Sequence, residues 1–171
     1  NIAYVYRQQA KYEEAISYLL KAIKLGEEIN NQNLLGSIHN QIALIQYNRK
    51  IYHDAQKYAT QALNYYNKLD DKQGKAISYT IIGGCYSEKG DMLNASKYIK
   101  EAYQLNIALG DKRQIASSAQ NLAEIELKNK NYRNALTYSN IGVNGLKEIN
   151  VVINLIGAYI TRAKIYIATK D

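Results

Sequence analysis

The sequence predicts an all-α fold, a right-handed superhelix (α-solenoid) of stacked antiparallel helix hairpins, and three observations lead to this prediction. One pattern returns four times at a step of 40 residues, as KYEEAISYLLKAI, IYHDAQKYATQAL, DMLNASKYIKEAY and NYRNALTYSNIGV. Within each copy the apolar residues advance by three or four positions, which is the period of one helix face. Proline, which interrupts helices, is absent from the chain.

Columns of equivalent residues keep the same step along the chain. Three of them are Ala15, Ala55, Ala95 and Ala135; Ala3, Ala43, Gly83, Ala123 and Ala163; and Tyr18, Tyr58, Tyr98 and Tyr138. Small residues leave room where two helices cross closely, and tyrosine rings bury a large apolar area beside such crossings. The columns therefore indicate a packing pattern that stacks similar hairpins, as in a repeat protein.

Each unit is expected to contain two helices of similar length. The predicted helices are a short stub before residue 11, then 11–29, 33–49, 52–69, 73–89, 92–109, 113–129, 132–149 and 152–169. The units are approximately 1–30 (partial), 31–70, 71–110, 111–150 and 151–171 (partial), all in one array. Asn31, Asp71 and Asp111 are predicted N-caps, and Gly90-Asp91 and Asn131 are predicted to open the other helices.

The last predicted helix lacks the polar face that usually closes a solenoid. Ile153, Ile156, Ile160 and Ile167 lie along it. We therefore expect the chain to be a segment of a longer array or of a multidomain protein.

Composition argues against several classes of function. The net charge is +7, but the basic surplus of the last quarter is spread over several helices, so no nucleic acid is expected as a partner. No apolar run reaches the roughly 20 residues of a bilayer span, and no membrane contact is expected. Cys85 is predicted to be a small buried apolar residue, His39 a groove or surface residue and His53 a surface residue. No catalytic motif, metal-ligand spacing or cofactor motif occurs, so neither an enzyme nor a cofactor is expected.

The repeat resembles the tetratricopeptide repeat. The resemblance rests on a small residue followed at fixed offsets by Tyr and two Ala, as in Ala3, Tyr6, Ala15 and Ala22, and in Gly83, Tyr86, Ala95 and Ala102. Usual units have about 34 residues, whereas these have 40 and lack the usual proline. The longer unit is similar to those of kinesin light chains, bacterial peptide-pheromone receptors and bacterial signalling regulators. Gln46 and Glu126 replace the expected aromatic residue, and looser packing is expected there.

The resemblance implies a concave groove lined by the first helix of each unit, with a protein or peptide partner bound in it. The implied contact residues are Ser37, Asn40, Leu44, Tyr47, Asn48, Ile77, Thr80, Glu88, Gln120, Glu124 and Lys128. Tyr47 is the expected anchor, and the alternative is that it packs inward in place of the aromatic residue missing at Gln46. The cationic clamp of chaperone-tail binders is absent, because Asn40, Gln41, Leu44, Ser117 and Asn121 occupy those positions.

The predicted function is a protein- or peptide-binding scaffold, as the repeat region of a bacterial signalling or regulatory protein. Two alternatives stay open: a sensor of the peptide-pheromone receptor type, and a structural array that forms a homo-oligomer through its uncapped ends. The abundance of Asn, Lys, Ile and Tyr is typical of AT-rich bacterial genomes. The cytoplasm and the periplasm of a bacterium both remain open as its location.

Overall fold

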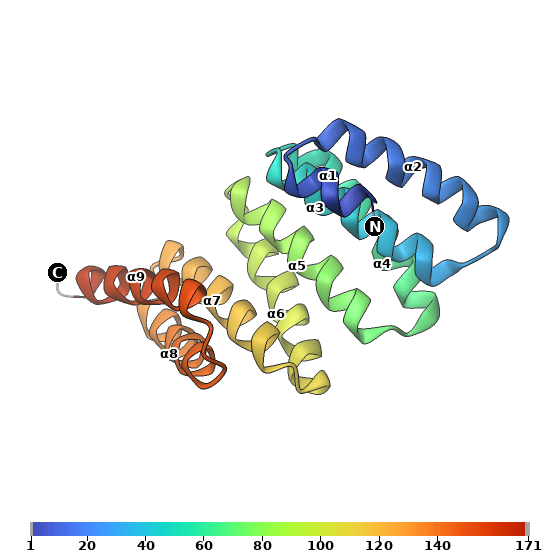
Figure 1. The fold of residues 1–171 in the computed structure, drawn as a ribbon. Coiled ribbons are helices and arrows are strands. Elements are labelled where there is room, and N and C mark those ends of the chain that lie inside the picture. The colour runs from blue at the N-terminus through green and yellow to red at the C-terminus, as the bar shows by residue number, and fades with distance from the viewer. Residues whose placement is uncertain (1, 170–171) are drawn as a thin grey trace.

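The computed structural model describes residues 2–169 and places them in nine helices joined by short turns. They are α1 (Ile2–Gln8), α2 (Tyr12–Glu28), α3 (Gln32–Asn48), α4 (Tyr52–Leu69), α5 (Lys72–Glu88), α6 (Met92–Leu109), α7 (Lys112–Lys128), α8 (Tyr132–Glu148) and α9 (Val152–Ala168). No strand occurs among these residues. Antiparallel hairpins follow one another from one end of the molecule to the other (Figure 1). The predicted solenoid of helix hairpins is confirmed.

Every turn between helices contains one residue in the left-handed region, and these residues recur at a step of 20. They are Ala10, Asn30, Lys50, Asp70, Gly90, Gly110, Lys130 and Asn150. The next residue closes each helix by donating to the carbonyl five positions back, as Ile51 does to Gln46 at 2.9 Å. The 40-residue unit is therefore built from two half-units with the same turn, which keeps the helices nearly equal in length.

The predicted helix starts are confirmed, and four of the five starting residues also cap their helix with a side chain. The side chains of Asn31, Asp71, Asp111 and Asp91 each accept a hydrogen bond from the backbone N–H three residues on. Asn131 precedes α8 but makes no such bond. Its side-chain amide instead donates to Glu126 Oε2 at 3.0 Å, because a buried carboxylate lies within reach.

The small-residue columns lie at the helix crossings, as predicted. Ala15, Ala55, Ala95 and Ala135 are fully buried, and so are Ala43 and Ala123 of the earlier column. Ala163 belongs to that earlier column by sequence but is exposed, because α9 packs only against the preceding helices α7 and α8 within the described part of the chain. The column marks the side of a first helix that its hairpin partner covers.

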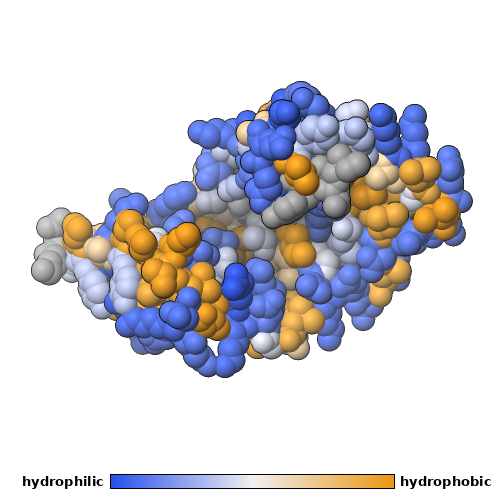
Figure 2. Space-filling model, in the orientation of Figure 1, coloured by the Kyte–Doolittle hydropathy of each residue, from blue (hydrophilic) through white to orange (hydrophobic). Residues whose placement is uncertain are grey.

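The outer face of α9 is exposed and apolar. Ile153 is 84% exposed and Ile167 is 70% exposed, and Val152, Ile156 and Ile160 lie beside them. Figure 2 shows hydrophobic residues gathered at this end of the molecule. Within residues 2–169, no helix combines the length and the apolar character needed to cross a bilayer.

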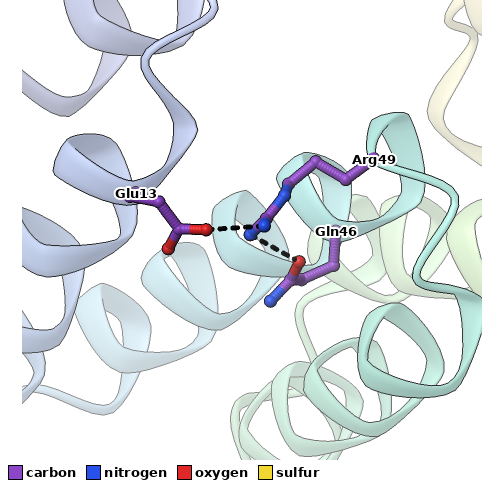
Figure 3. Close-up of polar contacts among 3 residues, drawn as sticks. All are labelled: Glu13, Gln46 and Arg49. Carbon is purple, nitrogen blue, oxygen red and sulfur yellow. Dashed lines mark hydrogen bonds and ion pairs between the residues drawn. The ribbon is translucent and has the colours of Figure 1, made fainter.

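The two polar residues in the aromatic column, Gln46 and Glu126, are buried and hydrogen-bonded, and the expectation of looser packing there stays a prediction. Gln46 Oε1 accepts from Arg49 at 3.3 Å, and Arg49 pairs with Glu13 Oε1 of α2 at 2.6 Å (Figure 3). Glu126 accepts from Asn131 and lies 3.6 Å from Lys100 Nζ of α6. An aromatic ring would fill the space between helices by its bulk. Gln46 instead connects to α2 through Arg49, and Glu126 lies beside Lys100 of α6.

Candidate functional site

A groove runs along the first helices α3, α5 and α7. It contains two cavities, which we name the α3–α5 cavity and the central cavity. The α3–α5 cavity, about 340 Å³, is lined by Ser37, Asn40, Gln41, Leu44, Tyr66, Ile77, Thr80, Ile81 and Gln114. The central cavity, about 290 Å³, is lined by Leu44, Tyr47, Thr80, Ile81, Gly83, Gly84, Ser87, Glu88, Ile99, Asn121, Glu124, Ile125 and Lys128. The two share Leu44, Thr80 and Ile81, so they form one continuous depression.

The central cavity lies where two first helices are set apart. α3 packs against α5, and α7 packs against α9, whereas α5 and α7 approach each other less closely. Gly83 and Gly84 of α5 line the cavity and allow Ile99 of α6 and Tyr47 of α3 to pack closely against α5. The outline of the molecule is notched between the end that carries α9 and the end that carries α1 and α2 (Figure 2).

Most of the predicted contact residues line these cavities. Those that do are Ser37, Asn40, Leu44, Tyr47, Ile77, Thr80, Glu88, Glu124 and Lys128. They share a face because positions three or four apart lie above one another on a helix. Asn48 is exposed outside the cavities, and Gln120 turns toward α8, where its Nε2 donates to the Ser139 carbonyl at 3.3 Å. Binding by any of these residues stays a prediction.

Tyr47 both packs inward and lines the central cavity. Its half-buried ring lies over Gly84, where an added Cβ would come within 3.1 Å of the ring. On its other side the ring centroid is 5.7 Å from that of Tyr52. Burial, followed by the carboxylate of Glu88 and then by Cys85, Tyr52 and Glu124, raises the pKa of Tyr47 to about 12. The hydroxyl therefore stays protonated at neutral pH and can donate a hydrogen bond into the cavity.

Asn40 holds two units together as well as lining the groove. It is buried, and its Oδ1 accepts from the Ser78 hydroxyl at 3.0 Å, while its Nδ2 lies 3.5 Å from the Gly74 carbonyl. Both partners belong to α5. The side chain therefore links α3 to α5, and its amide is already engaged when the groove is empty.

Two cavity residues lie on second helices, so the repeat columns of the first helices did not predict them. Tyr66 comes from α4 and Ile99 from α6, and both reach the groove between first helices. A glycine within a predicted helix could have indicated each of them, because a glycine marks a place where a large side chain of another helix packs closely. A Cβ at Gly74 would clash with the Tyr66 ring, and one at Gly83 would lie 2.7 Å from Ile99 Cδ1.

His39 lies inside the protein, so its predicted groove or surface position is wrong. It is 7% exposed, and its ring lies between those of Tyr58 and Tyr65 of α4, with centroids 5.9 Å and 5.5 Å away. Burial lowers the pKa of His39, while Glu27 opposes this shift. His53 is exposed beside Asp54, as predicted. Among the described residues no three His, Cys, Asp or Glu side chains gather as metal ligands.

Comparisons with known proteins show which proteins share this fold. Residues 1–27 and 76–106 match the family model of the tetratricopeptide repeat. Among solved structures, BtubC (BKLC) from P. vanneervenii is 16% identical, with a TM-score of 0.89 over 99% of this chain and 70% of that chain. These two stretches therefore match the tetratricopeptide repeat in sequence, and the described chain as a whole has the fold of a tetratricopeptide repeat solenoid. A search of curated proteins finds no match.

Two further structures are larger proteins that contain a similar array. A Signal Transduction ATPase with Numerous Domains (STAND) protein from Pyrococcus horikoshii, which has a tetratricopeptide repeat sensor, is 25% identical with a TM-score of 0.85. A Rap protein complexed with competence and sporulation factor is 17% identical with a TM-score of 0.76. This chain is covered to 99% in both cases but spans only 26% of the first and 53% of the second. The repeat family is one of non-catalytic protein-interaction scaffolds.

Proposed function

We propose that this chain holds an extended or helical peptide segment of a partner protein in the groove of α3, α5 and α7. In this proposal residues 1–171 are one array within a bacterial signalling or regulatory protein. The observation that carries it is the continuous groove, whose lining differs from unit to unit while the packing columns repeat. Positions that packing does not constrain are the ones that can encode specificity.

The chemistry of the groove suits a peptide. Leu44, Ile77 and Ile81 offer apolar area, and Ser37, Gln41 and Gln114 offer hydrogen-bonding groups beside it. A peptide presents this mixture, because its backbone needs donors and acceptors while its side chains bury apolar surface. The presence of a repeat sensor in the STAND protein and of a bound factor in the Rap complex is consistent with this use of the fold.

The test is selection of peptides from a random displayed library on the immobilised chain, followed by affinity measurements on groove variants. Thr80 lines both cavities, and its hydroxyl bonds only its own helix, at Ala76 O. Thr80→Phe should block the groove and weaken binding about tenfold or more, with little change in Tm. Thr60 makes the same kind of bond on the exposed surface of α4, so Thr60→Phe is the matched control.

Tyr47→Ala supplies a second arm of the same experiment. It removes the expected anchor and should weaken binding about tenfold, although it also removes packing on Gly84. Binding that is unchanged in both Thr80→Phe and Tyr47→Ala, or lost equally in Thr60→Phe, would place the site elsewhere. A library that yields no binding peptide would also count against the proposal.

A structural array is the second candidate, and the apolar outer face of α9 favours it. If copies associate through this face, sedimentation velocity should show a concentration-dependent oligomer. The double variant Ile153→Lys/Ile160→Lys should remain a monomer, because it places charges on residues that are exposed in the single chain. A monomer at every concentration in the unmodified chain would contradict this candidate.

The receptor-type alternative differs in one measurable respect. The wider spacing of α5 and α7 gives the array a place where neighbouring hairpins can close on a ligand. A sensor of this type should become more compact in small-angle scattering when a selected peptide binds. A rigid scaffold should keep its dimensions.

A further inference from the structure

We propose that the central cavity selects a peptide segment in which a large apolar side chain lies next to a lysine or arginine. The apolar side chain fills the cavity, and the neighbouring cation meets the carboxylates of Glu88 and Glu124 at its mouth. This inference rests on the proposed peptide-binding function and adds the chemical class of the ligand.

The floor of the central cavity is apolar. Ile81, Ile99 and Ile125 form it, and Leu44 is shared with the neighbouring cavity. Gly83 and Gly84 of α5 also line the cavity, where they pack against Ile99 and the ring of Tyr47. The floor isoleucines are buried, and the partly exposed apolar surface belongs to Leu44 and the ring of Tyr47. A leucine, isoleucine or aromatic side chain packed on these two residues would remove apolar surface of both partners from water, which favours binding.

The mouth of the cavity carries two carboxylates without a cationic partner. Glu88 Oε2 accepts from the Tyr52 hydroxyl at 3.2 Å, and Glu124 Oε1 accepts from the Thr161 hydroxyl at 3.2 Å. Neither glutamate takes part in an ion pair within the described residues. These neutral donors hold each carboxylate in place and engage one oxygen only. The other oxygen of each can accept from a ligand.

The one cation of the cavity does not neutralise them. Lys128 Nζ lies 3.4 Å from Ser87 Oγ and is not within ion-pair distance of Glu88 or Glu124. Both glutamates also act on Tyr47, whose pKa they raise, so their charges reach the same side of the cavity.

Charge complementarity therefore favours a cationic partner over an acidic one. A lysine or arginine at the mouth would gain charge-assisted hydrogen bonds, and the ring of Tyr47 adds an aromatic surface beside them. An acidic segment would face two like charges. Because the glutamates are exposed at the mouth, the attraction should weaken as salt concentration rises.

The experiment uses peptides selected on the unmodified chain. We expect leucine, isoleucine or an aromatic residue adjacent to lysine or arginine to be enriched, and replacing that basic residue by glutamate should weaken binding about tenfold or more. The double variant Glu88→Gln/Glu124→Gln should cause a similar loss and reduce the salt dependence. Glutamine keeps the size of each side chain and can still accept from Tyr52 and Thr161.

The matched control is Glu28→Gln/Glu101→Gln. It changes the net charge by the same amount at two exposed residues of α2 and α6 that line neither cavity. The control should bind within about twofold of the unmodified chain. Lys128→Gln should increase the affinity, because it removes a cation that competes with the basic residue of the peptide.

The outcomes separate this inference from the proposed function. Peptides that bind and are blocked by Thr80→Phe, but show no basic preference or no effect of Glu88→Gln/Glu124→Gln, would overturn the inference and leave the groove as the site. An equal loss in the control double variant would show a general effect of net charge and would also overturn it. If the affinity of the selected peptides is unchanged by both Thr80→Phe and Tyr47→Ala, both proposals are contradicted.

Discussion

Single residues in the turns adopt a backbone conformation that their side chains disfavour. Lys130 has φ 59° and Lys50 has φ 63°, in the left-handed region where a Cβ is crowded. Glycine occupies the equivalent position only at Gly90 and Gly110. Most of these turns therefore carry a residue that is less suited to the left-handed conformation than glycine would be.

Replacing such a residue by glycine should stabilise the protein. We expect Lys130→Gly to raise the free energy of unfolding by about 0.5–1 kcal/mol. Removing the crowded Cβ stabilises the folded state by more than the added backbone entropy of glycine stabilises the unfolded state. Urea unfolding followed by circular dichroism measures the change. Gly110→Ala at φ 68° should lower stability. A loss of stability in Lys130→Gly would show that the turn is not limited by its backbone conformation.

Alanines at the helix crossings have no room for a larger side chain. Ala95 is fully buried among Ile99, Leu122 and Ile125. Ala95→Leu should reduce the free energy of unfolding by about 1–3 kcal/mol, since the added atoms force helices apart. Lys57→Ala on the exposed side of α4 should change it by less than about 0.5 kcal/mol. Equal thermal melts for the two variants would contradict the assignment of the columns.

At the scale of one element, the start of α5 depends on a side-chain cap. Asp71 accepts from the Gly74 amide at 3.0 Å. Asp71→Ala should cost about 1 kcal/mol of unfolding free energy, whereas Asp71→Asn should cost much less, because asparagine is an equally good cap. Lys72→Ala, at the exposed next position, is the control for a neighbouring substitution. If Asp71→Asn is as unstable as Asp71→Ala, the cap bond is not the cause.

The cap of α6 should make stability depend on acid. The side chain and backbone amide of Asn94 donate to Asp91 at 2.7 and 3.0 Å and hold the pKa of Asp91 below its usual value. A lowered folded-state pKa adds stability that is present above the unfolded value of about 3.9 and lost as the pH falls through the folded value. Asp91→Asn should therefore lose less stability than the unmodified chain between about pH 5 and pH 3. Identical acid dependence in urea titrations would contradict this.

At the scale of the whole molecule, the principal contacts join helices one or two apart along the chain. A perturbation should therefore stay near its own unit. Ala135 is fully buried in α8, and Ala135→Leu should accelerate amide hydrogen exchange in α7, α8 and α9 while leaving α2, α3 and α4 nearly unchanged. Faster exchange throughout the chain would show that the array opens as one cooperative body.

The sequence by itself determined the repeat, the helices and their bounds to within one or two residues, and the buried alanine columns. It also determined the caps at Asn31, Asp71 and Asp111. These features are local or periodic, because helix faces, caps and crossings depend on residue types at short and constant spacings. The same periodicity brought Leu44, Tyr47 and Thr80 to the lining of the groove.

Only the tertiary structure decided which partners the polar residues choose and where the groove widens. His39 stacks against Tyr65, the side chain of Asn131 bonds Glu126, and Gln120 bonds the Ser139 carbonyl of α8. Each position depends on which groups of a neighbouring segment lie within contact or hydrogen-bond distance, and spacing along one chain cannot supply that. The separation of α5 and α7, which leaves the central cavity, likewise follows from how side chains of four helices fill the space together.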